Sequence, residues 1–486
     1  MKEILLLLAL LCFGNIDAQI IDFPDSTFKY ILIHGIYPSY HIYDTNHDNE
    51  IDMQEAASII NLSFKSLNVH DITGVRNFIN LRSLDVQNCG IYNFDLHDMV
   101  SLITFNCEYN YNLTTSIDVS GCSNLTSIRC GANPITNIKL TGAYSLQTFA
   151  ADYNALTQID FSGLTQLKTI SVRYGNLQSI NLTGVTNLET FYAYDNEITS
   201  LSISNRPNLR YVECDFNRLT NMDLNNNPSL VRVECDGNLL ESLTFDGTDN
   251  INSLNCRRNN LTTLNIKHLK KIKELDCSKN QIVSLDISNW DDIFPRKVDC
   301  SFNKLTSLIL NNTNVAYFSC GDNNFTTLDL SNRSKLIKLE CQNTPLTYLN
   351  ITNNNESPLM DSTNNQNINL TGNYNLYFIC ADYWQVGKYE NYMNQIGLRA
   401  KVGDVCNIQP IFTPNPTRDF VTINAIENIT SIYLYNLQGE LLTHSNFVLK
   451  NNTIVIDFSS YSTGVYFLKM TTESGININP KKIIKL

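Results

Sequence analysis

An acidic stretch near the N-terminus has the residue types and spacing of a calcium-binding loop. In YDTNHDNEIDMQEAAS, oxygen-bearing residues recur at the first, third, fifth, seventh, ninth and twelfth places of a loop that begins at Asp44. They are Asp44, Asn46, Asp48, Glu50 through its backbone carbonyl, Asp52 and Glu55. Because Ca²⁺ takes about six to eight hard oxygen ligands, this spacing predicts one structural Ca²⁺ ion. The alternative is a solvated acidic turn that caps the following helix.

Tyrosines and carboxylates in the middle of the chain predict a ligand-binding surface. Short segments such as ELDCS (274–278) alternate apolar and polar residues, which is typical of a strand with one buried face. This alternation gives the following outward residues: Arg173, Tyr192, Tyr194, Tyr211, Glu213, Asp215, Glu234, Asp236 and Arg257. Glu213 is expected beside Glu234, and Asp215 beside Asp236, at about 4.8 Å. Such a surface suits a basic ligand or a bridging divalent cation. Alternatively, the acids only keep the chain soluble.

These candidate residues belong to a repeat that covers most of the chain. The pattern is L-x-C-x-x-N-x-L-x-x-L, and its cysteine position returns every 20 to 23 residues. That position is held by Val86, Cys107, Cys130, Ala151, Val172, Ala193, Cys214, Cys235, Cys256, Cys277, Cys300, Cys320 and Cys341. A fixed period of this length predicts a solenoid whose strands form one long parallel sheet.

The repeated cysteines raise three possibilities, which are disulfides, metal ligands or packing residues. Alanine and valine hold the same position in mid-array, and the seven consecutive cysteines from Cys214 to Cys341 are odd in number. Residues in register hold their Cβ atoms about 4.8 Å apart, beyond the ~3.5–4.5 Å of a disulfide. The chain has no C-x-x-C pair, and no histidine recurs with the period. We therefore expect free, buried thiols that pack as small apolar groups.

In most turns an asparagine follows the cysteine position by three residues, and its amide is expected to bond the backbone of adjacent turns. Gly175 and Thr344 interrupt this row. The segment IKELDCSKNQI (272–282) resembles the leucine-rich repeat family, in particular the short internalin-like type. The resemblance implies a concave parallel sheet, a convex side of extended or 3₁₀ segments, and a binding scaffold. The acidic N-terminal loop in turn resembles EF-hand and dockerin-like calcium loops.

The C-terminal part changes character after the last repeat. A segment with helical spacing is expected to cap the solenoid, and Cys380 and Cys406 form one candidate disulfide. The final residues contain PNP (414–416), IYLYNLQGELL (432–442), STGVYFLKM (462–470) and a terminal KKIIKL. Together these motifs resemble the type A C-terminal sorting domain of the type IX secretion system. The resemblance implies a small immunoglobulin-like β-sandwich that interacts with that secretion machinery.

We predict five segments along the chain. They are a signal peptide (1–18), an N-terminal cap with the acidic loop (19–60), the solenoid (61–380), its C-terminal cap (381–408) and the sorting domain (409–486). No apolar stretch after the signal peptide is long enough to span a membrane.

The composition and motifs favour a binding protein. A net charge of −12 argues against nucleic acid as the partner. The chain contains no H-E-x-x-H, G-x-S-x-G or glycine-rich phosphate loop, so we expect no enzymatic activity. The leading hypothesis is a secreted or cell-surface protein that binds a protein or a glycan through its concave face. The alternative is a structural surface-layer component without a discrete ligand.

Overall fold

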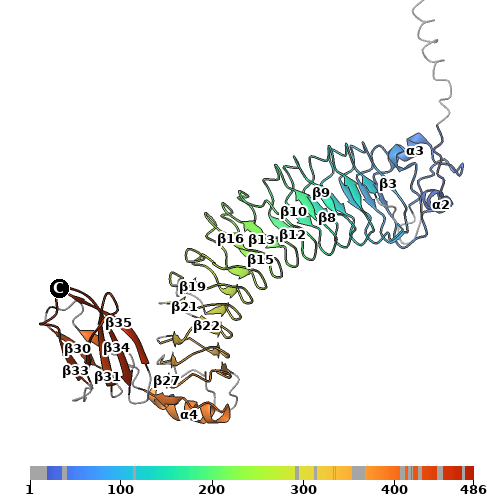
Figure 1. Ribbon diagram of the computed structural model, residues 1–486. Coiled ribbons are helices and arrows are strands. Elements are labelled where there is room, and N and C mark those ends of the chain that lie inside the picture. Colours follow the sequence, from blue (N-terminus) through green and yellow to red (C-terminus); the bar gives the residue numbers. More distant parts are fainter. Residues whose placement is uncertain are drawn as a thin grey trace, which may run out of the picture. The chain divides into compact units, whose positions relative to one another are not determined.

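The computed structural model describes residues 19–35, 41–112, 116–290, 295–310, 315–331, 333, 335–352, 359, 367–404, 411–413, 418, 420–424, 429–445, 453–472 and 477–486. The chain forms two compact units. Residues 376–486 belong to the second unit, together with 329–332 and 347–354. The first unit contains most of the repeats, which stack turn upon turn along the chain (Figure 1).

Two helices, α2 (Ser26–His34) and α3 (Met53–Ser58), precede the first strand. Phe28 of α2 lies at the centre of an aromatic cluster whose other ring centroids are 5.4 to 6.4 Å from its own. The other members are Phe23, Phe64 and Phe78. These rings cover the apolar interior that the first turn of a solenoid would otherwise expose.

One sheet of 15 parallel strands runs through the repeats, and we call it the main sheet. Its strands, in spatial order, are β1 (Asn61–Ser63), β2 (Ser83–Asp85), β4 (Thr104–Asn106), β6 (Ser127–Arg129), β8 (Thr148–Ala150), β10 (Thr169–Ser171), β12 (Thr190–Tyr192), β13 (Tyr211–Glu213), β15 (Arg232–Glu234), β17 (Ser253–Asn255), β18 (Glu274–Asp276), β20 (Arg296–Asp299), β22 (Val315–Ser319), β24 (Lys338–Glu340) and β26 (Ile368–Asn369). The strands pair in register with those of the next turn, as between Val212 and Val233, except for one register shift between β20 and β22 at Arg296. The main sheet confirms the predicted solenoid.

The opposite side of each turn is extended, as the resemblance implied. It carries short parallel strands in several small sheets, and a 3₁₀ helix, η1 (Val75–Asn77), lies in an early turn. The strands are β3 (Phe94–Asp95), β5 (Ser116–Asp118), β7 (Asn137–Lys139), β9 (Gln158–Asp160), β11 (Ser179–Asn181), β14 (Asn221–Asp223), β16 (Ser242–Thr244), β19 (Ser284–Asp286) and β21 (Ser307–Ile309). A separate four-stranded parallel sheet consists of β23 (Thr327–Asp329), β25 (Tyr348–Asn350), β27 (Phe378–Cys380) and β28 (Lys401–Gly403).

The interior row of small residues is present as predicted. Every residue at the cysteine position, from Val86 to Cys341, is at most 4% exposed. The cysteines at this position are free, and burial raises the pKa of thiols such as those of Cys107 and Cys214 well above the usual range. A protonated, buried thiol is unreactive, so these side chains act as packing groups.

Native protein should therefore label only slightly with a thiol reagent, whereas denatured protein should expose at least nine reactive thiols. The Cys256→Ala variant should lose about 1 kcal/mol of unfolding free energy, because it removes one small buried group. Thiol counting and denaturant unfolding measure the two effects. Oxidised sulfurs in the folded protein would contradict the packing role.

The asparagine row forms the backbone bonds that its position predicted. In Asn217, Nδ2 donates to the carbonyl of Ala193 in the previous turn (2.8 Å) and to that of Cys214 in its own turn (3.1 Å). Its Oδ1 accepts the amide of Ile198 at 2.9 Å. Thr344 keeps part of this pattern, since its hydroxyl donates to the carbonyl of Cys341 at 3.2 Å. The row therefore ties neighbouring turns together at one corner of the solenoid.

A helix follows the last repeat strand, as the spacing of apolar residues predicted. η3 (Tyr383–Gln385) leads into α4 (Val386–Gln395), which buries Tyr389 and Met393. Cys380, at the end of β27, is buried and disulfide-bonded. Cys406 lies outside the described residues, so its pairing with Cys380 stays a prediction.

The C-terminal residues form two antiparallel sheets. One contains β29 (Ile411–Thr413), β30 (Phe420–Asn424) and β33 (Thr453–Asp457), and the other contains β31 (Ile429–Asn436), β32 (Leu441–Ser445), β34 (Gly464–Thr472) and β35 (Asn477–Lys485). Buried side chains from both sheets, including Val421, Ile456 and Leu468, form one core. This is the small β domain that the sequence predicted.

Candidate functional site

The predicted ligand surface lies on the face of the main sheet that points away from the core, which we call the outer face. Register places Tyr192 beside Glu213, and Glu213 beside Glu234. The expected row of like charges on adjacent strands is therefore present. Because like charges abreast on a sheet repel one another, their stability depends on what neutralises them.

The predicted surface has four carboxylates, and arginines pair with two of them, Glu234 and Asp236. Arg232 donates from Nε to Glu234 at 2.8 Å. Arg258 binds Asp236 with two hydrogen bonds, Nε to Oδ1 at 2.8 Å and Nη2 to Oδ2 at 2.6 Å. Such a bidentate pair is among the stronger ion pairs in proteins. The surface is therefore less negative than four unpaired carboxylates would make it.

Glu213 and Asp215 are the two carboxylates of the four that have no ion pair among the described residues. Of these two, Asp215 is the buried one. It is only 8% exposed, and its Oδ1 accepts the amide of Asp236 at 2.8 Å. Burial is the main reason that the pKa of Asp215 is raised to about 7. The bond from the Asp236 amide lowers this pKa in part, and the charges of Glu234 and Asp236 raise it. This side chain is ionised at neutral pH only at a cost to stability.

The two ends of the predicted surface differ. Arg173 donates from Nη2 to Asp152 at 3.0 Å, and its guanidinium carbon lies 5.3 Å from the ring centre of Tyr192. Arg257, at the other end, has a buried Nε without a hydrogen-bond partner in the described part of the chain. Arg173 is thus held in place, whereas Arg257 keeps unused donor capacity.

Sequence reasoning missed a second row of side chains, at the corner where each strand ends. The residue two places after the cysteine position has a positive φ in every turn from Asn88 to Asn343. Its amide bonds the next turn, as from Phe216 to the carbonyl of Asp236 at 2.8 Å. We call this row the left-handed corner. Its bulky members are Tyr109, Tyr153, Tyr174, Phe216, Arg258, Lys279 and Phe302. The signal in the sequence was the recurrence of aromatic residues at this one position.

In the acidic loop Asn49, at the sixth place, lies in the left-handed region, which asparagine adopts more readily than most residues. Its carboxylates, however, accept amides of the loop itself. Glu55 Oε1 accepts the amide of Thr45 at 2.7 Å, and Asp44 Oδ2 accepts that of Asn49 at 3.1 Å. Across the described residues, no three His, Cys, Asp or Glu side chains converge as a metal ion would need. Ca²⁺ binding at this loop stays a prediction.

Millimolar Ca²⁺ should raise the melting temperature if this loop binds the ion, because a ligand that binds only the folded state stabilises it. The Glu55→Gln variant, which weakens the twelfth-place ligand, should lose that rise. Glu50→Gln is the matched control, because the Glu50 side chain pairs with Lys29 (2.6 Å) and only its carbonyl is a predicted ligand. Identical melting of the wild type in chelator and in Ca²⁺ would leave the loop as a helix-capping turn.

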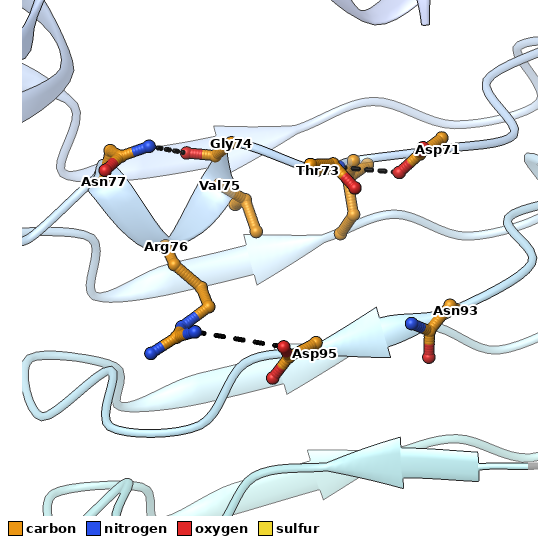
Figure 2. Close-up of a pocket in the computed structure, with 9 residues that line it drawn as sticks. Asp71, Thr73, Gly74, Val75, Arg76, Asn77, Asn93 and Asp95 are labelled. Atoms are coloured by element: carbon orange, nitrogen blue, oxygen red, sulfur yellow. Dashed lines mark hydrogen bonds and ion pairs between the residues drawn. The ribbon is translucent and has the colours of Figure 1, made fainter. Parts of the chain in front are cut away.

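A polar hollow of about 490 Å³ lies beside η1 and is lined by Asp71, Arg76 and Asp95, among others (Figure 2). Arg76 Nη1 is 3.9 Å from the Asp95 carboxylate, and Asp71 accepts the amide of Thr73 at 2.7 Å. Because its charged groups pair within the hollow, we assign it no ligand.

Comparison with known families identifies the C-terminal domain. Residues 411–485 match the secretion system C-terminal sorting domain, whereas comparison of the chain with curated proteins gives no significant match. No helix of the described residues has the length and apolar character needed to cross a membrane.

Several solved structures are similar to the chain. The functional domain of InlJ from Listeria monocytogenes, which includes a cysteine ladder, is 20% identical with a TM-score of 0.47, and the match covers 96% of this chain and 100% of that one. The leucine-rich repeat domain of APL1B is 16% identical with a TM-score of 0.44, over 60% of this chain and 84% of that one. The effector YopM from Yersinia pestis is 18% identical with a TM-score of 0.40, over 55% and 74%.

Proposed function

We propose that this chain, a leucine-rich repeat solenoid with a secretion sorting domain, is a non-enzymatic binding protein of the cell surface or the extracellular medium. Its ligand is a protein or glycan that contacts the outer face of the main sheet between Arg173 and Arg257. A parallel sheet whose equivalent positions stack from turn to turn offers a continuous surface to a large ligand. The sorting domain supports export, and the type IX secretion machinery is the partner in that step.

The observation that carries this proposal is the unpaired carboxylate of Asp215. It is buried beside Glu234 and Asp236 without an arginine of its own, although both neighbours have one. Asp215 accepts the amide of Asp236, which a neutral side chain such as asparagine could also do, so its charge costs stability without being needed for this bond. A destabilising buried charge is typical of a functional site. A ligand that brings a cationic or hydrogen-bond-donating group to Asp215 and Glu213 would relieve the cost.

The test compares wild type with a Glu213→Gln/Asp215→Asn double variant in capture from a panel of extracellular-matrix proteins, cell-wall glycans and whole bacteria. We expect the double variant to lose at least tenfold in capture while it remains folded. Asp223→Asn is the control, because Asp223 is exposed on β14, on the opposite side of the turn. Equal capture by wild type and double variant would remove the outer face as the site. Capture of the chain by itself alone would instead favour the structural surface-layer component.

A further inference from the structure

The left-handed corner stacks its side chains at the spacing of the turns. Tyr153 and Tyr174, in consecutive turns, have ring centroids 4.4 Å apart and planes inclined by 9°. Lys279 lies 5.7 Å from the ring centre of Phe302 in the next turn. These separations are near the ~4.8 Å strand spacing, so side chains at this corner stand side by side in one row. A small residue in the row therefore leaves a gap one turn wide.

One such gap is filled by an arginine of the chain itself. Gly237 is the small residue, and a Cβ there would meet the ring of Phe216 at 2.9 Å, so this ring leans over the glycine. From the turn beyond, Arg258 places its guanidinium carbon 4.8 Å from the ring centre of Phe216. The same guanidinium binds the carboxylate of Asp236. An aromatic ring and an acid thus hold one cation across the gap.

A second gap has a tyrosine on either side, and a tyrosine holds the corner position that Arg258 holds at the first gap. Ala132 is the small residue, with Tyr109 one turn before it and Tyr153 one turn after. These three residues line a hollow of about 600 Å³ with Glu108, Gly131 and Asp152. Tyr109 and Tyr153 are 48% and 58% exposed, so their rings are accessible.

The hollow at Ala132 also carries an unpaired acid. Glu108 Oε1 lies 3.5 Å from the point where a Cβ of Gly131 would stand, so the carboxylate reaches over this glycine. Asp152 is already paired with Arg173, whereas Glu108 has no ion pair among the residues that the structure describes. The gap at Ala132 is therefore lined by one carboxylate, that of Glu108, that has no ion pair among the described residues.

We propose that the gap at Ala132 binds an arginine side chain of a partner protein, in the way that Arg258 fills the gap at Gly237. Two turn spacings separate Tyr109 from Tyr153, or about 9.6 Å, so a guanidinium midway is about 4.8 Å from each ring. That distance is within the ~6 Å range of cation–π attraction. Glu108 supplies the counter-charge that Asp236 supplies to Arg258.

Charge and precedent favour a protein-borne arginine as the occupant. The cations that lie over aromatic rings of the left-handed corner are the side chains of Arg258 and Lys279, so this corner already binds cationic side chains of a protein. The chain has a net charge of −12, which attracts a basic partner and disfavours a second copy of itself. This slot lies outside the surface between Arg173 and Arg257, so it does not depend on the function proposed above.

Calorimetric titration of the full chain with acetyl-Gly-Arg-Gly-amide tests the proposal. We expect saturable binding, at least tenfold weaker binding of the citrulline analogue, which is neutral, and at least fivefold weaker binding by Glu108→Gln. Tyr153→Arg should abolish binding, because it places an internal arginine where Arg258 stands in the other gap. The Glu213→Gln/Asp215→Asn variant should bind the tripeptide like wild type, which separates this slot from the outer face.

Tyr317→Arg is the control for the added charge, because Tyr317 is an exposed tyrosine of β22 rather than a corner residue. It should bind like wild type, and thermal melting should show that both arginine variants are folded. Equal binding of the arginine and citrulline peptides would overturn the proposal. So would unchanged binding by folded Tyr153→Arg, or binding of a neutral oligosaccharide in place of the peptide.

Discussion

Replacing Asn217 by alanine should lower the unfolding free energy by about 3 kcal/mol. The amide of Ile198 bonds to Oδ1 of Asn217 and has no other acceptor in the described part of the chain. The two carbonyls that Asn217 bonds would each keep another donor. Asn196 donates to the carbonyl of Ala193 at 3.3 Å, and Asn238 donates to that of Cys214 at 3.0 Å. The variant therefore leaves the buried amide of Ile198 without a hydrogen-bond acceptor and creates a small cavity. Denaturant unfolding measures the loss.

Asn208→Ala is the matched control. The Asn208 amide makes only a long, exposed bond of 3.4 Å to Asn187, so its loss should change the unfolding free energy by less than about 0.5 kcal/mol. If the two variants unfold at the same denaturant concentration, the asparagine row does not hold the turns together. A Thr substitution at 217 should recover part of the loss, because the hydroxyl of Thr344 bonds a carbonyl at the equivalent place.

The repeat made the main sheet predictable. Buried and exposed residues alternate within each strand, and equivalent strands recur about every 21 residues, so only one register between neighbouring strands buries all the apolar residues. Once Cys214 and Cys235 are buried in register, Glu213 must lie beside Glu234, as the structure has it. The free state of the thiols followed from the same geometry. Each of these conclusions depends on backbone placement, which the repeat determines.

What the sequence did not reveal are contacts that depend on side-chain reach across turns. Arg258 was not among the predicted residues because alternation, continued from the buried Cys256, assigns it to the inward side. The left-handed backbone at the corner instead leaves its guanidinium partly exposed and within reach of Asp236. The bond of Arg258 to Asp236, together with that of Arg232 to Glu234, leaves Glu213 and Asp215 as the acids of the expected four-carboxylate patch that have no ion pair among the described residues. The positive φ at the left-handed corner could not be predicted either, because tyrosine and phenylalanine are not residues that indicate a left-handed backbone.

Asp215→Asn should stabilise the protein above neutral pH, by up to about 4 kcal/mol at pH 8. The folded state raises the pKa of Asp215 from 3.8 to about 7, chiefly by burial, and each pKa unit corresponds to about 1.4 kcal/mol. Between these pH values the folded chain binds a proton that the unfolded chain has released. The stabilisation from Asp215 is therefore complete below about pH 4 and is lost as the pH rises through about 7.

Asparagine keeps the acceptor for the Asp236 amide but carries no charge, so the variant should match wild type at pH 4 and exceed it increasingly up to pH 8. Denaturant unfolding at intervals over this range gives the difference, because titrating groups far from Asp215 contribute equally to both proteins. Asp223→Asn, at an exposed position, should differ from wild type by less than about 0.5 kcal/mol throughout. If the unfolding free energies of Asp215→Asn and wild type ran parallel with pH, water or a neighbouring cation would already compensate the charge of Asp215. That outcome would contradict its role as an unpaired acid of the outer face.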